Sequence, residues 1–307
     1  MWHHDLMWHY KMRYVMKQVF LVILLVFGFV AGAQNKIVKK PKKQKHATTQ
    51  VAPKKHKSQS NSRKAGTVKR VATKASYSNG TLTVNGIKYN MVWVDGGTFR
   101  MGATSEQGSD AWDDEIPVHS VTLSGYYIGK TEVTQALWKA VMGSNPSYFK
   151  GDNRPVEGVS WDDCQVFIRK LNSLTGQNFR LPTEAEWEFA CRGGNNSRGY
   201  KYSGSNYINN VAWYEDNSGE KPHPVATKSP NELGIYDMNG NVKEWCTDGY
   251  EKYSSGAQTN PKGPYDGSIR VLRGGSWSDV AGFCRSSSRS SSLHVYGYYD
   301  AGLRLSL

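Results

Sequence analysis

The chain has 307 residues, enough for one large domain or two average ones. Its formal net charge of +13 is unevenly distributed, because residues 1–75 carry 17 Lys and Arg and one acidic residue, whereas the rest of the chain holds 22 basic and 25 acidic residues. The basic character therefore belongs to the N-terminal arm, and the nearly neutral remainder gives no support for a nucleic-acid-binding domain.

The N-terminus has the pattern of an export signal. Basic residues at 11–17 precede an apolar run at 19–30, and Ala-Gly-Ala at 31–33 is a typical cleavage pattern. We therefore expect residues 1–33 to be a signal peptide and the protein to be periplasmic, displayed on the cell surface or secreted. Lysines at 36–43 follow the apolar run and oppose translocation, so an uncleaved membrane anchor is the alternative.

The next segment, residues 34–78, is rich in Lys, Ser, Thr, Ala and Gln and nearly free of large apolar residues. Such a segment cannot bury enough surface to offset the entropy lost on ordering, so we predict a basic disordered linker. It serves either as a solvated spacer or as an electrostatic contact with an anionic envelope surface.

A folded domain is predicted over residues 79–307. It opens with two short segments, 81–84 and 87–89, that flank the pair Asn85-Gly86. Because Asn-Gly is the strongest short hairpin signal, we expect these segments to form two antiparallel strands.

Two segments have clear helical periodicity. The first, 134–142, has Ala and Leu/Val residues on one face, and Thr131 just upstream is a candidate cap. The second, 161–175, has Val166, Phe167 and Leu171 at helical spacing, with Ser160 as its candidate cap. We predict a helix at each.

A third, shorter helix is predicted at 182–190. Thr183 can cap it, and Glu186 stands at the reciprocal position of a capping box. After Arg192 the sequence predicts loops and short strands. A domain with so few regular elements needs other stabilisation, for which buried Trp residues, disulfides and metal ions are the candidates.

The four cysteines, Cys164, Cys191, Cys246 and Cys284, permit two disulfides in three pairings if the chain is exported. No pair has zinc-finger spacing. The alternative is that some are small buried apolar residues, which we favour for Cys164 because it stands in a predicted helix.

Seven phrases in the domain together resemble the formylglycine-generating enzyme (sulfatase-modifying factor) family. They follow the family order over roughly residues 89–307. The resemblance implies a single α+β domain of the C-type-lectin-like type, with little regular secondary structure. The phrases are Gly-Gly-Thr-Phe-Arg-Met-Gly at 96–102, Lys-Thr-Glu-Val-Thr at 130–134, Pro-Val-Glu-Gly-Val-Ser-Trp at 155–161, Arg-Leu-Pro-Thr-Glu-Ala-Glu-Trp-Glu at 180–188, Gly-Asn-Val-Lys-Glu-Trp at 240–245, Arg-Gly-Gly-Ser-Trp at 273–277 and Gly-Leu-Arg-Leu at 302–305.

The resemblance also implies structural calcium. Oxygen ligands that mix carboxylates with backbone carbonyls suit this hard ion. The alternative is that the two carboxylates of the first site only cap turns. The first implied site is Asp237, the carbonyls of Gly240 and Val242, and Glu244; the second is Asn210, the Val211 carbonyl, Asn217 and the Gly219 carbonyl.

Oxidases of this family bind Cu(I) through two cysteines five residues apart. The present chain has Asp279 at the first of these positions and Cys284 at the second. Cu(I) prefers thiolates, so a carboxylate is a poor replacement. We therefore expect no copper and no oxidase activity, with a sulfatase-maturing oxidase or a degenerate relative kept as the alternative.

The stretch 278–301 has an unusual composition. It contains no Lys, Glu, Gln, Met or Trp, five types that make up about one fifth of the chain. These are the types that no codon ending in C encodes. The stretch lies between the phrases at 273–277 and 302–305.

That combination resembles the variable protein of a diversity-generating retroelement, in which adenine-directed mutagenesis turns AAC codons into NNC. The alternative is an ordinary Ser-rich loop with half-buried tyrosines. By the resemblance, Trp277, Arg285, Arg289 and Gly302 are fixed framework. The implied variable, ligand-binding residues are Ser278, Asp279, Val280, Ala281, Gly282, Phe283, Ser286, Ser288, Ser290, Ser291, Leu293, His294, Val295, Tyr296, Tyr298 and Tyr299.

Tyr with Ser and Gly suits a binding surface, because Tyr supplies large contact area at low entropic cost. His294 beside Tyr296, Tyr298 and Tyr299 is the expected hot spot. The sequence thus predicts an exported protein that binds a protein or glycan on another cell or a phage. A structural component of an envelope machine is the remaining alternative.

Overall fold

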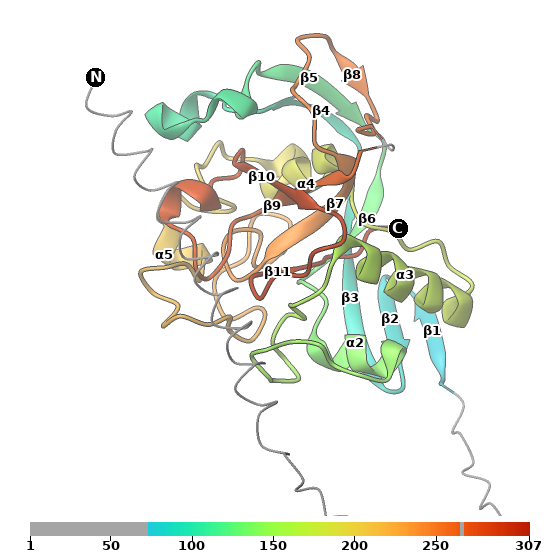
Figure 1. The fold of residues 1–307 in the computed structure, drawn as a ribbon. Coiled ribbons are helices and arrows are strands. Elements are labelled where there is room, and N and C mark those ends of the chain that lie inside the picture. Colours follow the sequence, from blue (N-terminus) through green and yellow to red (C-terminus); the bar gives the residue numbers. More distant parts are fainter. Residues whose placement is uncertain (1–72, 265–266) are drawn as a thin grey trace, which may run out of the picture. The chain divides into compact units, whose positions relative to one another are not determined.

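The computed structural model describes residues 73–264 and 267–307. The predicted signal peptide and nearly all of the predicted linker lie outside these residues. Within the described part of the chain, no helix is both long and apolar enough to cross a membrane. Three small sheets and a few helices make up the domain (Figure 1).

The first sheet has the strand order β1-β2-β3-β6. The predicted hairpin is confirmed: β2 and β3 pair antiparallel, with Val84 opposite Ile87. Asn85 and Gly86 both have positive φ, of 49° and 84°, as a tight hairpin turn requires. The strands are β1 (Ala75–Ser78), β2 (Thr81–Val84), β3 (Ile87–Val94) and β6 (Tyr126–Gly129).

Strand β1 corrects the predicted boundary of the linker, because it lies inside 34–78 and pairs with β2. The reason is a contact far along the chain that composition does not reveal. The ring of Tyr77 packs edge-on against that of Phe179, with ring centroids 5.4 Å apart. The folded domain therefore includes Ala75 and the residues that follow it.

Two further sheets contain the remaining strands. One has the order β10-β9-β7-β11, in which Ile269 pairs with Leu293 across the antiparallel ladder of β9 and β10. The other has the order β4-β5-β8. Their strands are β4 (Gly97–Met101), β5 (His119–Leu123), β7 (Lys243–Gly249), β8 (Gln258–Thr259), β9 (Ile269–Arg273), β10 (Arg289–Leu293) and β11 (Ala301–Gly302).

All three predicted helices are present, and α2 and α3 lie beside the first sheet (Figure 1). The helices are α2 (Gln135–Met142), α3 (Trp161–Thr175), α4 (Glu184–Cys191) and the short α5 (Ile208–Val211), with 3-10 turns η1 (Ser105–Asp110), η2 (Asp113–Glu115), η3 (Gly194–Asn196) and η4 (Ala281–Cys284). Loops and short strands occupy most of the chain after Arg192, as predicted.

The caps are mostly those predicted. Ser160 and Thr183 each accept the N–H of the third residue of their helices, in reciprocal capping boxes. The cap of α2, however, is Thr134 and not Thr131, whose hydroxyl donates to the carbonyl of Glu132. Val166 also differs from the other periodic residues of α3, since it faces solvent with 42% of its surface exposed.

The core contains aromatic and aliphatic side chains of α2, α3 and α4 together with those of the strands. Trp138 of α2 stacks on Phe167 of α3, with ring centroids 4.8 Å apart. Trp187 of α4 and Trp245 of β7 are fully buried, which confirms that Trp residues supply part of the stabilisation. All four cysteines are buried and free, so in this structure they act as small apolar residues, as expected for Cys164.

Candidate ligand-binding surface

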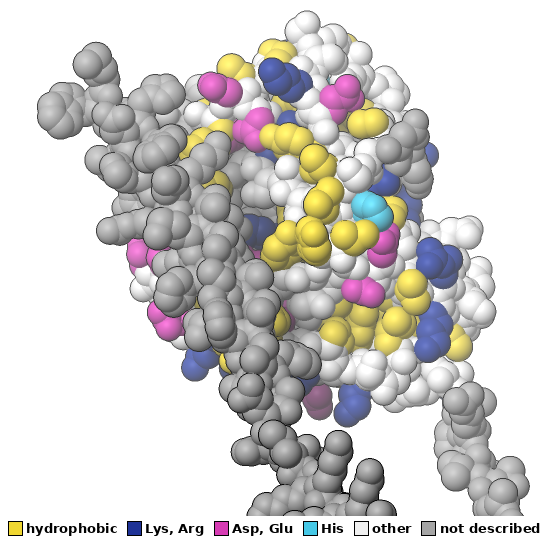
Figure 2. Space-filling model, in the orientation of Figure 1, with side chains coloured by type: hydrophobic (Ala, Val, Ile, Leu, Met, Phe, Trp, Pro, Cys, Tyr) yellow, Lys and Arg dark blue, Asp and Glu magenta, His cyan; other side chains and the backbone are white. Residues whose placement is uncertain are grey.

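The C-terminal stretch runs through η4, β10 and the turn after β10. Its exposed large apolar side chains are those of Leu293, Val295 and Tyr296, which are 39%, 54% and 53% exposed. Figure 2, in the orientation of Figure 1, shows hydrophobic side chains gathered over the region of β9 and β10, with a histidine beside them. An apolar patch with polar neighbours is typical of a surface that binds a partner.

Three residues of the predicted variable set lie inside the protein, which corrects their assignment to the surface. Ser286 and Ser288 are buried because the guanidinium of Arg273 draws the backbone between them inward, donating to both of their carbonyl oxygens. Asp279 is buried, and the ammonium of Lys243, whose Nζ lies 2.7 Å from its Oδ2, compensates its charge there. In this conformation these three side chains do not reach a ligand.

The two arginines that are predicted to be framework are held by buried ion pairs. Arg285 donates to both carboxylate oxygens of Glu115, at 2.8 and 2.5 Å. Arg289 donates to both oxygens of Glu184, at 2.6 and 2.7 Å. Such bidentate bonds fix position as well as contributing energy. The path of the stretch is therefore set by residues outside the predicted variable set.

The predicted hot spot is only partly assembled. His294 is oriented by Asp162 of α3, whose Oδ2 lies 2.8 Å from its Nδ1, a partner that the sequence did not indicate. Tyr296 is exposed, but Tyr298 and Tyr299 are half-buried. The hydroxyl of Tyr298 is hydrogen-bonded to that of Ser292 at 2.6 Å.

Aromatic residues outside the stretch extend this surface, and sequence reasoning missed two of them. Tyr148 is 64% exposed, and its ring centroid lies 5.1 Å from that of Tyr299. Trp112 stacks on Phe283 of the stretch, with ring centroids 5.2 Å apart. The available signal for Tyr148 was an aromatic pair, with Phe149, in an otherwise polar loop.

The loop assigned to the first calcium site contains a buried ion pair. Both carboxylate oxygens of Glu244 accept hydrogen bonds from Arg304, and Oε2 also accepts from Trp187 at 2.7 Å. Asp237 accepts the N–H of Ala226 at 2.7 Å, and burial raises its pKa to about 6. The carboxylate of Glu244 is thus hydrogen-bonded to donors of the protein, whereas the carboxylate of Asp237 is an oxygen ligand of the kind that calcium prefers.

A third carboxylate lies near this pair and was not among the predicted residues. Burial, then the charges of Asp237 and Glu244, raises the pKa of Glu132 well above its usual range. Among the described residues, however, no group of three or more His, Cys, Asp and Glu side chains is placed to hold a metal ion. Calcium at this loop, with Gly240 and Val242 as carbonyl ligands, stays a prediction.

The second predicted calcium set is already hydrogen-bonded internally. The side-chain oxygen of Asn217 accepts the N–H of Tyr214 at 2.9 Å, and its amide donates to Asn209 at 3.2 Å. The side-chain amide of Asn210 instead donates to the hydroxyl oxygen of Ser205 at 3.5 Å. The side chain that faces Asn217 is therefore Asn209. Calcium here, with the Val211 and Gly219 carbonyls, also stays a prediction.

The two positions that correspond to the copper ligands of family oxidases are buried together with charged groups. Lys243 Nζ lies 2.7 Å from both Asp279 and Asp300. Burial, and next the nearby Asp279 carboxylate, raises the pKa of the Cys284 thiol, so its thiolate form is disfavoured. This donor set is a poor one for Cu(I).

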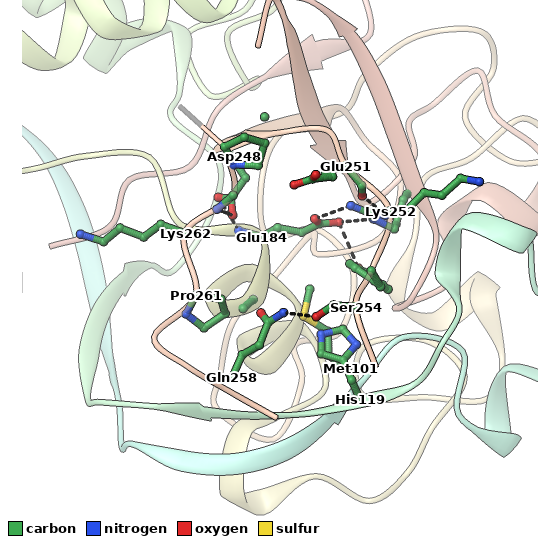
Figure 3. Close-up of a pocket in the computed structure, with 16 residues that line it drawn as sticks. Met101, His119, Glu184, Asp248, Glu251, Lys252, Ser254, Gln258, Pro261 and Lys262 are labelled. Atoms are coloured by element: carbon green, nitrogen blue, oxygen red, sulfur yellow. Dashed lines mark hydrogen bonds and ion pairs between the residues drawn. The ribbon is translucent and has the colours of Figure 1, made fainter. Parts of the chain in front are cut away.

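A cavity of about 340 Å³ is lined by residues of β4, β5, α4, β7 and β10, and Arg289 of β10 is one of them. Figure 3 shows the residues that line it. Glu184 and Asp248 approach each other in it, and the Asp248 carboxylate accepts the N–H groups of Glu184 and Gly263 at 3.0 and 2.8 Å. Burial, then the charge of Glu184, raises the pKa of Asp248 to about 7. The buried carboxylates of the cavity are thus bonded to groups of the protein itself.

Residues 82–306 match the model of the sulfatase-modifying factor enzyme 1-like domain. Over aligned regions that cover 69% of this chain, the sequence is 37% identical to the chaperone protein LppX of Paenibacillus barcinonensis and 31% identical to the formylglycine-generating enzyme of Streptomyces coelicolor. These regions cover 84% and 87% of the two relatives.

Solved structures of other proteins also match this chain. Treponema denticola variable protein 1 is 35% identical, with a TM-score of 0.67 over 74% of this chain and 97% of that one. PvdO from Pseudomonas aeruginosa is 25% identical, with a TM-score of 0.61 over 70% of this chain and 93% of that one. The predicted α+β, C-type-lectin-like fold of the formylglycine-generating-enzyme type is thereby confirmed.

Proposed function

This chain belongs to the family of sulfatase-modifying factor enzyme 1-like domains, and from that membership we propose that it is an exported binding protein whose C-terminal surface a retroelement diversifies. The similarity to Treponema denticola variable protein 1, which covers nearly all of that protein, supports this choice within the family. So does the absence from residues 278–301 of every residue type that NNC codons cannot encode.

One structural observation carries the proposal. The stretch is fixed by Arg285 and Arg289, whose buried carboxylate partners come from η2 and α4. A surface can accept many side chains only if its backbone does not depend on them. Two bidentate buried pairs meet that requirement, because neither involves a position of the proposed variable set.

The proposed binding surface consists of the predicted variable residues that are at least partly exposed. Asp279, Ser286 and Ser288 are left out because they are buried. The remaining residues are Ser278, Val280, Ala281, Gly282, Phe283, Ser290, Ser291, Leu293, His294, Val295, Tyr296, Tyr298 and Tyr299.

The geometry favours a binding protein over a copper oxidase. Two thiolates are the donors that Cu(I) prefers, and the first of the two positions holds Asp279, ion-paired with Lys243. Although formylglycine-generating enzymes are among the relatives, the residues at these two positions do not reproduce a two-thiolate site.

Three further features belong to the proposal. We propose that the ligand is a protein or glycan on another cell or a phage, that the basic N-terminal segment contacts an anionic envelope surface, and that calcium binds near Asp237. Calcium would stabilise loops that lack a continuous strand ladder. The neutral folded domain itself is not proposed to bind nucleic acid.

Deep sequencing of the last hundred codons in a clonally descended population tests the proposal. We expect substitutions to cluster within codons 278–301, at first and second bases, with C retained at the third. Codons 210–270 of the same reads serve as the control. Equal variation in the two regions would overturn the proposal and favour an invariant scaffold of an envelope assembly.

A further inference from the structure

The exposed aromatic side chain of Tyr148 adjoins the proposed binding surface but belongs to a loop between α2 and α3. We infer that Tyr148 is a constant binding residue of that surface, and that the ligand it contacts is a protein. The inference rests on the proposed function, because it assigns a fixed anchor and a ligand class to the same surface.

The loop that carries Tyr148 is held from below by two buried side chains. The amide of Gln135 donates to the Phe149 carbonyl at 2.8 Å, and its oxygen accepts the N–H of Gly151 at 3.0 Å. The carboxylate of Glu157 accepts the N–H of Phe149 at 2.8 Å. Gln135 and Glu157 are both fully buried. Tyr148 is therefore presented by an ordered backbone, so binding loses little conformational entropy there.

The rings around Tyr148 form a continuous row with the C-terminal stretch. Tyr148 lies 5.1 Å from Tyr299 and 4.9 Å from Phe149, and Phe149 lies 5.3 Å from Trp277, as centroid distances. The indole of Trp277 donates to the Tyr299 carbonyl at 3.2 Å. One ring of this row belongs to the proposed variable set, and the other three do not.

The ring angles favour a protein ligand over a glycan. Tyr148 is tilted by 50° from Tyr299 and by 83° from Phe149, so the row is ridged and offers no broad flat platform for sugar rings. The polar side chain of Asn145 in this loop also bonds to the protein itself: its amide donates to Gln135 at 2.8 Å and its oxygen accepts the N–H of Ser147 at 3.1 Å. A ridged surface of aromatic rings suits the apolar side chains of a protein.

The test uses a random-peptide display library as the probe. Peptides are selected on the full chain and counter-selected on a variant with Leu293→Ser, Val295→Ser and Tyr296→Ser, so that retained peptides depend on the proposed surface. Their affinities are then measured for the wild type, Tyr148→Ala and Tyr148→Phe. A Trp93→Ala variant is the matched control, because Trp93 is 49% exposed on β3.

We expect Tyr148→Ala to weaken binding of these peptides at least tenfold, as for a hot-spot aromatic residue. Tyr148→Phe and Trp93→Ala should bind as the wild type does, and all variants should keep the wild-type melting temperature. Unchanged affinity of Tyr148→Ala would overturn the inference while the proposed function stands. A glycan array that yields ligands when the peptide library yields none would overturn the ligand class. If neither probe gives ligands that depend on the three outer residues, the proposed function itself fails.

Discussion

The guanidinium of Arg289 and the carboxylate of Glu184 meet in two hydrogen bonds of 2.6 and 2.7 Å, which join β10 to the first turn of α4. The guanidinium also lies over the ring of Tyr253, at 3.9 Å from its centroid. A single side chain thus connects the strand that carries the proposed binding residues to the core of the domain.

Removing this side chain should destabilise the fold. Arg289→Ala leaves the Glu184 carboxylate buried and without its main partner, which costs about 3 kcal/mol or more. Lys201→Ala is the control, because Lys201 pairs with Asp110 at the surface and its loss should cost less than about 1 kcal/mol. Urea unfolding measures both, and equal midpoints for the two variants would contradict the assignment of Arg289 as an anchor.

The shared ion pair of Lys243 predicts strong non-additivity. Because Asp279 and Asp300 both lie 2.7 Å from its ammonium, either one can neutralise it alone. Asp279→Asn and Asp300→Asn should each lower the free energy of unfolding by about 1 kcal/mol. The double variant leaves a buried ammonium without a negative partner, so its loss should exceed the sum of the two single losses by at least about 1 kcal/mol. A double-mutant cycle in urea checks this, and additive losses would count against it.

Burial separates two sets of serines in the stretch. Ser288→Tyr places a large ring in a filled interior and should cost about 2 kcal/mol or more. Ser291 is an exposed residue of β10, so Ser291→Tyr should change the free energy of unfolding by less than about 0.5 kcal/mol. Thermal melts of the pair decide whether position 288 belongs to the interior, since equal melting temperatures would return it to the surface.

Two buried carboxyl groups should make the fold less stable as pH rises from about 4.5 to about 7. Burial raises the pKa of Glu157 from 4.5 to about 7. The stability that this carboxyl group contributes to the fold is therefore fully present below its unfolded pKa near 4.5, and it is lost as pH rises to about 7. Asp248, whose pKa is also raised to about 7, acts in the same direction. Glu157→Gln removes one titrating group, so the loss in melting temperature between pH 5 and pH 8 should be smaller than in the wild type.

The same melts include a check on this assignment. Asp152→Asn, at an exposed acidic residue, is the matched control substitution. If Glu157→Gln and the wild type lose the same number of degrees between pH 5 and pH 8, the buried carboxyl of Glu157 is not the group responsible.

Calcium should raise the melting temperature of the wild type if it binds near Asp237. The Asp237→Asn variant loses a charged oxygen ligand and should show a smaller shift. Titration with calcium and, as a matched salt control, magnesium followed by thermal melts measures the effect. A wild-type melting temperature that calcium leaves unchanged would remove calcium from the proposal.

The local elements could be read from the sequence, because their causes lie within a few residues of each other. Ser160 caps α3 through the N–H three residues later, and Asn85-Gly86 closes its hairpin by their own backbone angles. The ordered family phrases likewise fixed the expected fold, and the composition of 278–301 identified the candidate surface.

What the sequence could not determine was which residues of that stretch face outward, because burial depends on partners distant along the chain. Arg285 finds Glu115 across 170 positions and Arg289 finds Glu184 across 105. Ser286 and Ser288 are drawn inward by Arg273, and Tyr148 reaches the surface only because the loop between α2 and α3 folds back beside Tyr299. Capping and turn chemistry act over a few residues, whereas ion pairing and burial require the tertiary fold that brings distant segments together.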